Sequence, residues 1–164
     1  MERLWAPWRM AYIGTGGSSE CIFCAIPAAS VEDDGGNLLI HRGERCFVVM
    51  NRFPYNPGHL MVAPYRHVGA YDELTEEELL ELNRLTQRGL RVLRGLMNPQ
   101  GFNLGVNLGK GAGAGFADHV HMHVVPRWDG DTNFMPVLGD VRVIPEALDA
   151  TCQRLRDAWL KSAG

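Results

Sequence analysis

The sequence lacks several features that would place it in a specialised class. No stretch approaches the roughly 18 consecutive apolar residues that a membrane-spanning helix needs. The first residues also lack the apolar run and small-residue cleavage site of a secretory signal peptide. We therefore expect a cytoplasmic protein with no membrane partner.

Positive charge is not in excess, and no segment is repeated. The chain of 164 residues has 16 Lys and Arg against 19 Asp and Glu, a net charge of −3, whereas nucleic-acid-binding domains are usually strongly basic. Its length and its 46% of hydrophobic residues fit one compact domain over residues 1–164 that does not bind nucleic acid. Within that domain we distinguish an aromatic N-terminal arm at 1–20, a core at 21–128 and a C-terminal extension at 129–164.

Cysteine is scarce, with four in the chain. Cys46 and Cys152 stand alone within apolar patterns, which predicts small buried core residues. Cys21 and Cys24 are separated by two residues. In a reducing compartment such a pair is typical of metal binding or of redox thiols, and the spacing alone leaves both interpretations open.

Short apolar runs bounded by turn residues predict a sheet. The expected strands are 38–40, 46–50, 59–63, 102–108 and 119–125, with a further candidate at 141–144. Thr75 and Glu78 have the spacing of a capping box, and apolar residues at near-helical spacing follow as far as Leu96. A C-terminal helix from Pro145 carries one apolar stripe, formed by Leu148, Cys152, Leu155 and Trp159. This order of elements indicates an α+β fold with a mainly antiparallel sheet, one long helix and one C-terminal helix.

Residues 119–125 alternate histidine with apolar side chains. Because neighbouring side chains in a strand point to opposite faces, the three histidines share one face, and the apolar residues can be buried on the other. Same-face neighbours lie roughly 6.6 Å apart at about 3.3 Å per residue, which is long for three ligands of one ion. We therefore expect a division of roles among His119, His121 and His123.

A neutral imidazole at His121 suits nucleophilic catalysis. If Nδ1 donates to a backbone carbonyl, Nε2 keeps a lone pair that can attack phosphorus and split one displacement into two steps. His123 can then donate to the phosphate oxygens as charge builds up. Upstream, the glycine-rich loop 109–115 holds Lys110, and its backbone N–H groups can approach an anion closely. This loop is the expected phosphate cradle.

The sequence His-Val-His-Met-His-Val-Val-Pro-Arg at 119–127 resembles the signature of the histidine triad family. The block 49–60, with its Asn-x-x-Pro-x-x-Pro-Gly-His pattern, is similar to the upstream motif of the fragile-histidine-triad branch. Residues 4–10, 102–109 and 126–128 also resemble the bacterial diadenosine tetraphosphate phosphorylase group of that family. The resemblance implies a histidine triad fold, nucleoside phosphate substrates and a homodimer.

The resemblance also implies roles for single residues. His121 would be the nucleophile, Asn51 would hold a ribose and Asn107 a phosphate. We expect a catalytic contribution from His119 and His123 as well. The remaining predicted substrate-binding residues are His59, Lys110, Gly113, Gly115 and Trp128.

Two departures from the family bear on the reaction. Some members carry Ser or Thr shortly before the triad to assist the leaving group, where this chain has Gly115 and Phe116. The branch that transfers nucleotides to sugar phosphates lacks the third histidine, which is present here as His123. The first departure favours substrates with a good leaving group, and the second favours transfer to water or phosphate.

Cys21 and Cys24 need two more ligands to complete a zinc site. The candidates are His41, His59, His67 and His119. Family members with this cysteine pair typically carry a histidine in the place of His67, so the resemblance points to His67 as the third ligand and His119 as the fourth. We expect one structural zinc per chain.

The leading hypothesis is an enzyme that cleaves dinucleoside polyphosphates such as diadenosine tetraphosphate through a nucleotidyl-histidine intermediate. Phosphate or water could resolve that intermediate, and the matches at the N-terminus and at Trp128 favour phosphate. A nucleoside phosphoramidate hydrolase is one alternative. A zinc-stabilised nucleotide-binding module without turnover is another, although a binding module has no need of a nucleophile.

Overall fold

A computed structural model describes residues 21–131 and 147–162. In these ranges five strands form one antiparallel sheet in the order β1-β2-β3-β5-β4. The strands are β1 (Leu39–Arg42), β2 (Cys46–Met50), β3 (Leu60–Pro64), β4 (Gly101–Val106) and β5 (Met122–Arg127). The predicted α+β class is confirmed. No helix in the described ranges is both long enough and apolar enough to cross a membrane.

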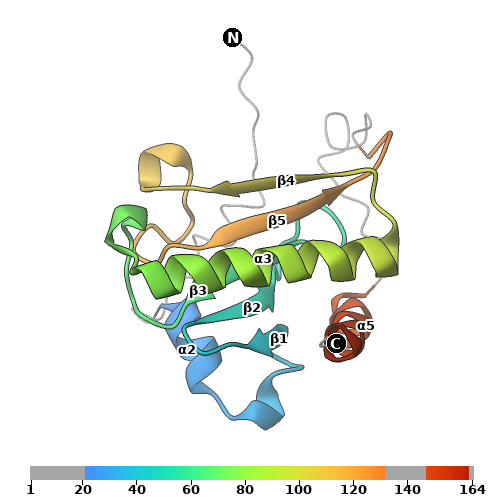
Figure 1. The fold of residues 1–164 in the computed structure, drawn as a ribbon, viewed down its shortest axis with the longest axis horizontal. Coiled ribbons are helices and arrows are strands. Elements are labelled where there is room, and N and C mark those ends of the chain that lie inside the picture. The colour runs from blue at the N-terminus through green and yellow to red at the C-terminus, as the bar shows by residue number, and fades with distance from the viewer. Residues whose placement is uncertain (1–20, 132–146, 163–164) are drawn as a thin grey trace.

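Helices α3 (Glu76–Met97) and α5 (Leu148–Lys161) pack on the sheet, with α3 lying along it (Figure 1). The predicted capping box starts α3. The Thr75 hydroxyl accepts from the backbone N–H of Glu78 at 3.2 Å, and the Glu78 carboxylate accepts from the Thr75 N–H at 2.9 Å. Asn98, in the left-handed conformation with φ of 49°, ends the helix.

The two faces of the sheet carry separate apolar clusters. Leu60, Val62 and Val124 belong to the larger cluster, which α3 and α5 cover and which includes Cys46 and Cys152, buried as predicted. The smaller cluster, on the opposite face, contains Phe47, Val49 and Met61 from the strands and Phe23 from helix α2 (Ile22–Ala28). The sequence did not predict α2, which places the cysteine pair on this second face.

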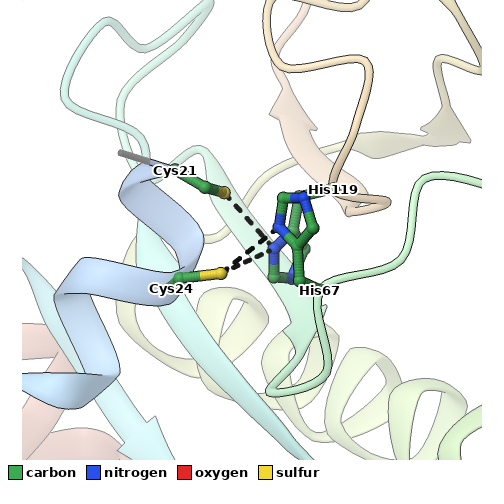
Figure 2. A group of neighbouring side chains, drawn as sticks. All are labelled: Cys21, Cys24, His67 and His119. Atoms are coloured by element: carbon green, nitrogen blue, oxygen red, sulfur yellow. Dashed lines mark hydrogen bonds between the residues drawn. The ribbon is translucent and has the colours of Figure 1, made fainter. Parts of the chain in front are cut away.

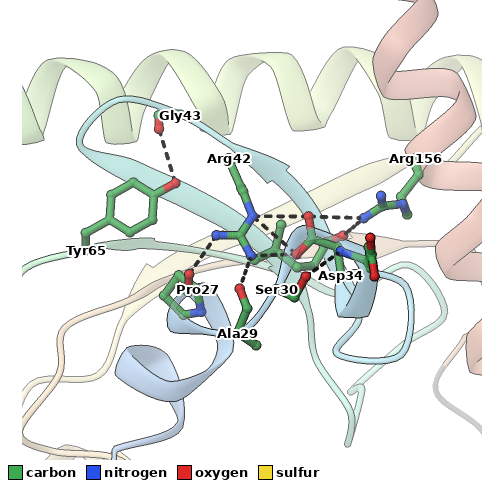
Figure 3. Close-up of polar contacts among 10 residues, drawn as sticks. Pro27, Ala29, Ser30, Asp34, Arg42, Gly43, Tyr65 and Arg156 are labelled. Carbon is green, nitrogen blue, oxygen red and sulfur yellow. Dashed lines mark hydrogen bonds and ion pairs between the residues drawn. The ribbon is translucent and has the colours of Figure 1, made fainter.

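A set of polar contacts fastens the end of α2 to β1 (Figure 3). The Arg42 guanidinium donates to the carbonyls of Pro27 at 2.7 Å and Ala29 at 3.1 Å, and it forms an ion pair with Asp34 at 2.7 Å. Arg156 of α5 lies 3.9 Å from the same carboxylate. Three segments far apart in sequence are thereby held at one edge of the sheet.

The histidine segment differs from its prediction in one respect. The predicted strand 119–125 begins only at Met122, because β3 pairs with β5 through Leu60–Val62 and no further. Pro64 has no N–H with which to continue the ladder, and its carbonyl accepts from the His119 side chain instead. The expected arm at 1–20 and strand at 141–144 lie outside the described residues.

Candidate active site and metal cluster

Four side chains meet where α2 approaches the sheet (Figure 2). Cys21 immediately precedes α2 and Cys24 lies in its first turn, while His67 follows β3 and His119 precedes β5. One potential ligand atom from each residue lies within 4.8 Å of the others. This group combines the cysteine pair with the two histidines that the resemblance selected. The other two candidates lie elsewhere, since His41 stacks on Trp159 and His59 contacts His123.

The spacing of these atoms fits the tetrahedral coordination of a metal ion. His119 Nδ1 lies 3.4 Å from the Cys21 sulfur and 3.6 Å from the Cys24 sulfur, and His67 Nδ1 lies 3.3 Å from the Cys24 sulfur. Zinc bonds of about 2.3 Å to sulfur and 2.0–2.1 Å to nitrogen at tetrahedral angles place the two ligand atoms roughly 3.5 Å apart. The cluster can therefore hold a metal ion.

His119 has the tautomer that a ligand in this position needs. Its Nε2 lies 2.9 Å from the carbonyl oxygen of Pro64. Because a carbonyl can only accept, Nε2 carries the hydrogen and Nδ1 presents its lone pair to the cysteine sulfurs. Burial lowers the pKa of His119, which also favours the neutral ring.

The backbone of His119 orients His121. The carbonyl oxygen of His119 accepts from Nδ1 of His121 at 2.9 Å, so the lone pair of His121 resides on Nε2. The side chain is buried, with 6% of its surface exposed, and this burial lowers its pKa below the ordinary value. His121 therefore meets the condition set for a nucleophilic imidazole, a neutral ring with a free Nε2 lone pair.

His59 and His123 form a second pair of histidines, next to His121. The Tyr55 N–H donates to Nδ1 of His59 at 3.1 Å, and His59 Nε2 lies 2.9 Å from Nδ1 of His123. In neutral rings the accepting Nδ1 of His59 places its hydrogen on Nε2, which donates to Nδ1 of His123. His123 then carries its own hydrogen on Nε2. In this tautomer His123 can donate from Nε2, and its predicted contact with phosphate oxygens stays a prediction.

A cavity of about 440 Å³ lies beside these histidines. Among the described residues that line it, Lys110 is the sole Lys or Arg. The glycine-rich loop turns at Gly109 and Gly113, whose φ angles of 72° and 82° favour glycine. The cavity is lined by Phe23, Asn51, Phe53, Tyr55, Met61, Asn107, Lys110, Gly113, Ala114, Gly115, Phe116, His121 and His123.

Comparison with known proteins places the chain in a family. The HIT domain profile matches residues 36–130, more than half of the sequence. The chain belongs to the HIT family. A relative from Mycobacterium tuberculosis named AP-4-A phosphorylase is 42% identical over 98% of this chain and 86% of its own length.

Two further proteins are similar to this chain. A bis(5'-adenosyl)-triphosphatase of Dictyostelium discoideum is 37% identical over 51% of this chain and 56% of its own. The crystal structure of a Zn-bound histidine triad family protein from Mycobacterium smegmatis superposes with a TM-score of 0.68 at 29% identity. It covers 88% of this chain and 96% of its own. The predicted HIT fold is confirmed.

Most of the predicted substrate-binding residues line the cavity beside the histidines, namely Asn51, Asn107, Lys110, Gly113 and Gly115. His59 adjoins it through His123. Besides His59, two predicted site residues do not line the cavity. His119 belongs to the metal cluster, and the Trp128 indole donates to the Met97 carbonyl at 3.3 Å. A substrate contact of Trp128 stays a prediction.

Sequence reasoning missed three aromatic side chains of the cavity, Phe23, Phe53 and Tyr55. Phe53 and Tyr55 lie inside the Asn-x-x-Pro-x-x-Pro-Gly-His block, at positions that the motif leaves unspecified. Phe23 lies between the two cysteines, and their spacing pointed to Cys21 and Cys24 as ligands but assigned no role to Phe23. The signal that could have found it was an apolar residue placed directly between two predicted ligands.

Proposed function

We propose that this HIT-family chain is a dinucleoside polyphosphate phosphorylase that cleaves diadenosine tetraphosphate with inorganic phosphate. The observation that carries the proposal is the hydrogen bond from His121 Nδ1 to the His119 carbonyl, which leaves a nucleophilic Nε2 on a ring that lines the cavity. The relative named AP-4-A phosphorylase, 42% identical over nearly the whole chain, supports the choice of substrate.

The reaction would run in two displacements. His121 Nε2 attacks an α-phosphorus, the P–N bond forms, and the P–O bond to the next phosphate breaks with release of adenosine triphosphate. Inorganic phosphate then attacks the adenylyl-histidine, the P–N bond breaks, and adenosine diphosphate leaves while Nε2 regains its lone pair. His123 donates from Nε2 to the phosphoryl oxygens in both steps.

The cavity residues would divide the remaining work. Asn51 holds the ribose and Asn107 the phosphate that is attacked. Lys110 and the backbone N–H groups up to Gly115 hold the second anion, which is first the leaving polyphosphate and then the incoming phosphate. Phe116 carries no hydroxyl to assist a poor leaving group, which favours a polyphosphate over an amine.

The metal cluster would hold one structural zinc per chain. Structural zinc sites commonly consist of two thiolates and two imidazoles. The distances between the sulfur and nitrogen atoms of this cluster agree with those expected from zinc–sulfur and zinc–nitrogen bond lengths. The relative from Mycobacterium smegmatis is itself described as Zn-bound. By binding His119, the metal would fix the position of the segment from His119 to His121. It would thereby also fix the position of His121, the proposed nucleophile.

A homodimer is also proposed. Among the described strands β4 is the last in the sheet. Leu104 on β4 is 50% exposed, and Leu108, just after it, is 48% exposed. An apolar edge strand of this kind favours pairing with another chain. Analytical ultracentrifugation should find a dimer for the wild type and a larger monomer fraction for Leu104→Lys.

Product analysis tests the proposed reaction. Diadenosine tetraphosphate is incubated with the protein at phosphate concentrations from zero to millimolar, and products are separated by chromatography and identified by mass. We expect adenosine diphosphate and triphosphate with phosphate, and slow formation of adenosine monophosphate without it. A product ratio that ignores phosphate would indicate a hydrolase, and faster cleavage of an adenosine phosphoramidate would indicate the amine-releasing alternative. Binding without any turnover would indicate a nucleotide-binding module.

A further inference from the structure

The side chain of Phe23 occupies a distinctive place between the metal cluster and the proposed nucleophile. It lies in the first turn of α2, between the two ligand candidates Cys21 and Cys24, and 1% of its surface is exposed. Its ring stacks on His121, with centroids 4.5 Å apart and planes 25° apart. It also contacts His119 at 5.4 Å and meets Phe116 edge-on at 5.8 Å.

The contact with His121 supplies a restraint that the hydrogen bond lacks. One hydrogen bond, from Nδ1 to the His119 carbonyl, fixes a single point on the imidazole and leaves the ring able to tilt about it. An aromatic face 4.5 Å away and nearly parallel opposes that tilt. The direction of the Nε2 lone pair depends on the tilt, so the stack on Phe23 restrains that direction together with the edge-on contact between His121 and His123 at 4.8 Å.

We propose that Phe23 is a positioning residue for His121, and that the metal cluster fixes Phe23 by binding the cysteines on either side of it. The inference rests on the proposed role of His121 as nucleophile. The cluster then acts on His121 by two routes, one through the carbonyl of its ligand His119 and the other through the ring carried by α2. Loss of the second route alone should misalign the imidazole while all four metal ligands stay in place.

The chain offers a matched control in Phe47. Phe47 is buried in the same apolar cluster as Phe23. Its ring contacts Tyr65 at 5.3 Å, while Phe23 contacts His119 and His121. Phe23→Leu and Phe47→Leu remove the same atoms from the same face of the sheet. A purely structural role would make the two variants alike.

The test combines steady-state kinetics with NMR of the His121 ring, each on protein whose zinc content has been measured. For Phe23→Leu we expect full zinc content, a kcat on diadenosine tetraphosphate lowered roughly tenfold to hundredfold, a smaller change in KM, and a broadened or shifted Nδ1–H signal of His121. Phe47→Leu should keep wild-type kcat and a wild-type His121 signal. Equal effects in the two variants, or a wild-type His121 signal or kcat in Phe23→Leu, would overturn the inference.

A measurement on the unaltered protein covers the case in which Phe23→Leu does not fold. Carbon-bound protons of an imidazole stacked on a phenyl face are shielded, so the His121 ring protons should resonate upfield of their usual range. Unshifted His121 protons would refute the stack itself. If the wild type does not cleave the substrate at all, the proposed function fails, and the NMR comparison still decides whether Phe23 orients His121.

Discussion

Replacement of Arg42 by Met tests how α2 is fastened to the sheet. Asp34 is almost fully buried, with 6% of its side chain exposed, and its Arg42 partner is 25% exposed. Removing one partner of a buried ion pair costs about 3–5 kcal/mol, because the other charge is left in a low dielectric. The partial exposure of Arg42 and the presence of Arg156 at 3.9 Å argue for the lower end, about 3 kcal/mol. Arg42→Met also removes the hydrogen bonds to the carbonyls of Pro27 and Ala29 (Figure 3).

For a chain of this length a loss of about 3 kcal/mol lowers the melting temperature by roughly 6–12 °C. Thermal and urea unfolding followed by circular dichroism measure the change. Arg42→Lys keeps the charge but cannot make the paired guanidinium hydrogen bonds to Asp34. Its melting temperature should therefore fall between those of Arg42→Met and the wild type. The control is Arg42→Met combined with Asp34→Asn, because this double variant also removes the buried charge that Arg42→Met leaves unpaired. A loss of stability in the double variant as large as in Arg42→Met alone would refute the argument from burial.

Three further predictions address the metal, the acceptor and the pH dependence of stability. Elemental analysis should find about one zinc per wild-type chain and a large loss in Cys24→Ser, with a lower melting temperature; zinc-free wild type from chelator-free preparation would contradict the site. Lys110→Ala should raise the phosphate concentration for half-maximal phosphorolysis roughly fivefold to tenfold, while an unchanged value would remove Lys110 from the acceptor site. The hydrogen-bonded guanidinium of Arg66 lowers the pKa of Glu78 below 4.5, so the pair contributes stability above pH 4.5 that is lost as the pH falls through the folded-state pKa. In urea titrations Glu78→Gln should therefore lose less stability than the wild type below pH 4.5. Parallel plots of unfolding free energy against pH for the two proteins would contradict a stabilising role of the pair.

The features predictable from sequence were those encoded over a few neighbouring residues. The capping box of Thr75 and Glu78 sets the start of α3, and the alternation at 119–125 separates the histidines from Val120 and Val124, which are buried in the larger cluster. The cysteine spacing indicated a metal or redox pair, and the family resemblance was needed to select His67 and His119 from four histidines.

The features that could not be predicted depend on contacts between distant segments. The bond between His59 and His123 joins residues 64 positions apart. Its direction depends on the Tyr55 N–H, which no side-chain pattern reveals. The start of β5 at Met122 depends on Pro64 in a neighbouring strand. The stack of Phe23 on His121 requires α2, a seven-residue helix without a side-chain cap.

Trapping the adenylyl-enzyme intermediate tests the proposed covalent role of His121. Enzyme and diadenosine tetraphosphate are mixed without phosphate, quenched under conditions that preserve P–N bonds, digested, and analysed by peptide mass spectrometry. We predict an adenylyl group on His121 that disappears when phosphate is added before the quench and that is absent from His121→Ala. Turnover by His121→Ala at even a tenth of the wild-type rate, or an adduct on another residue, would contradict the account.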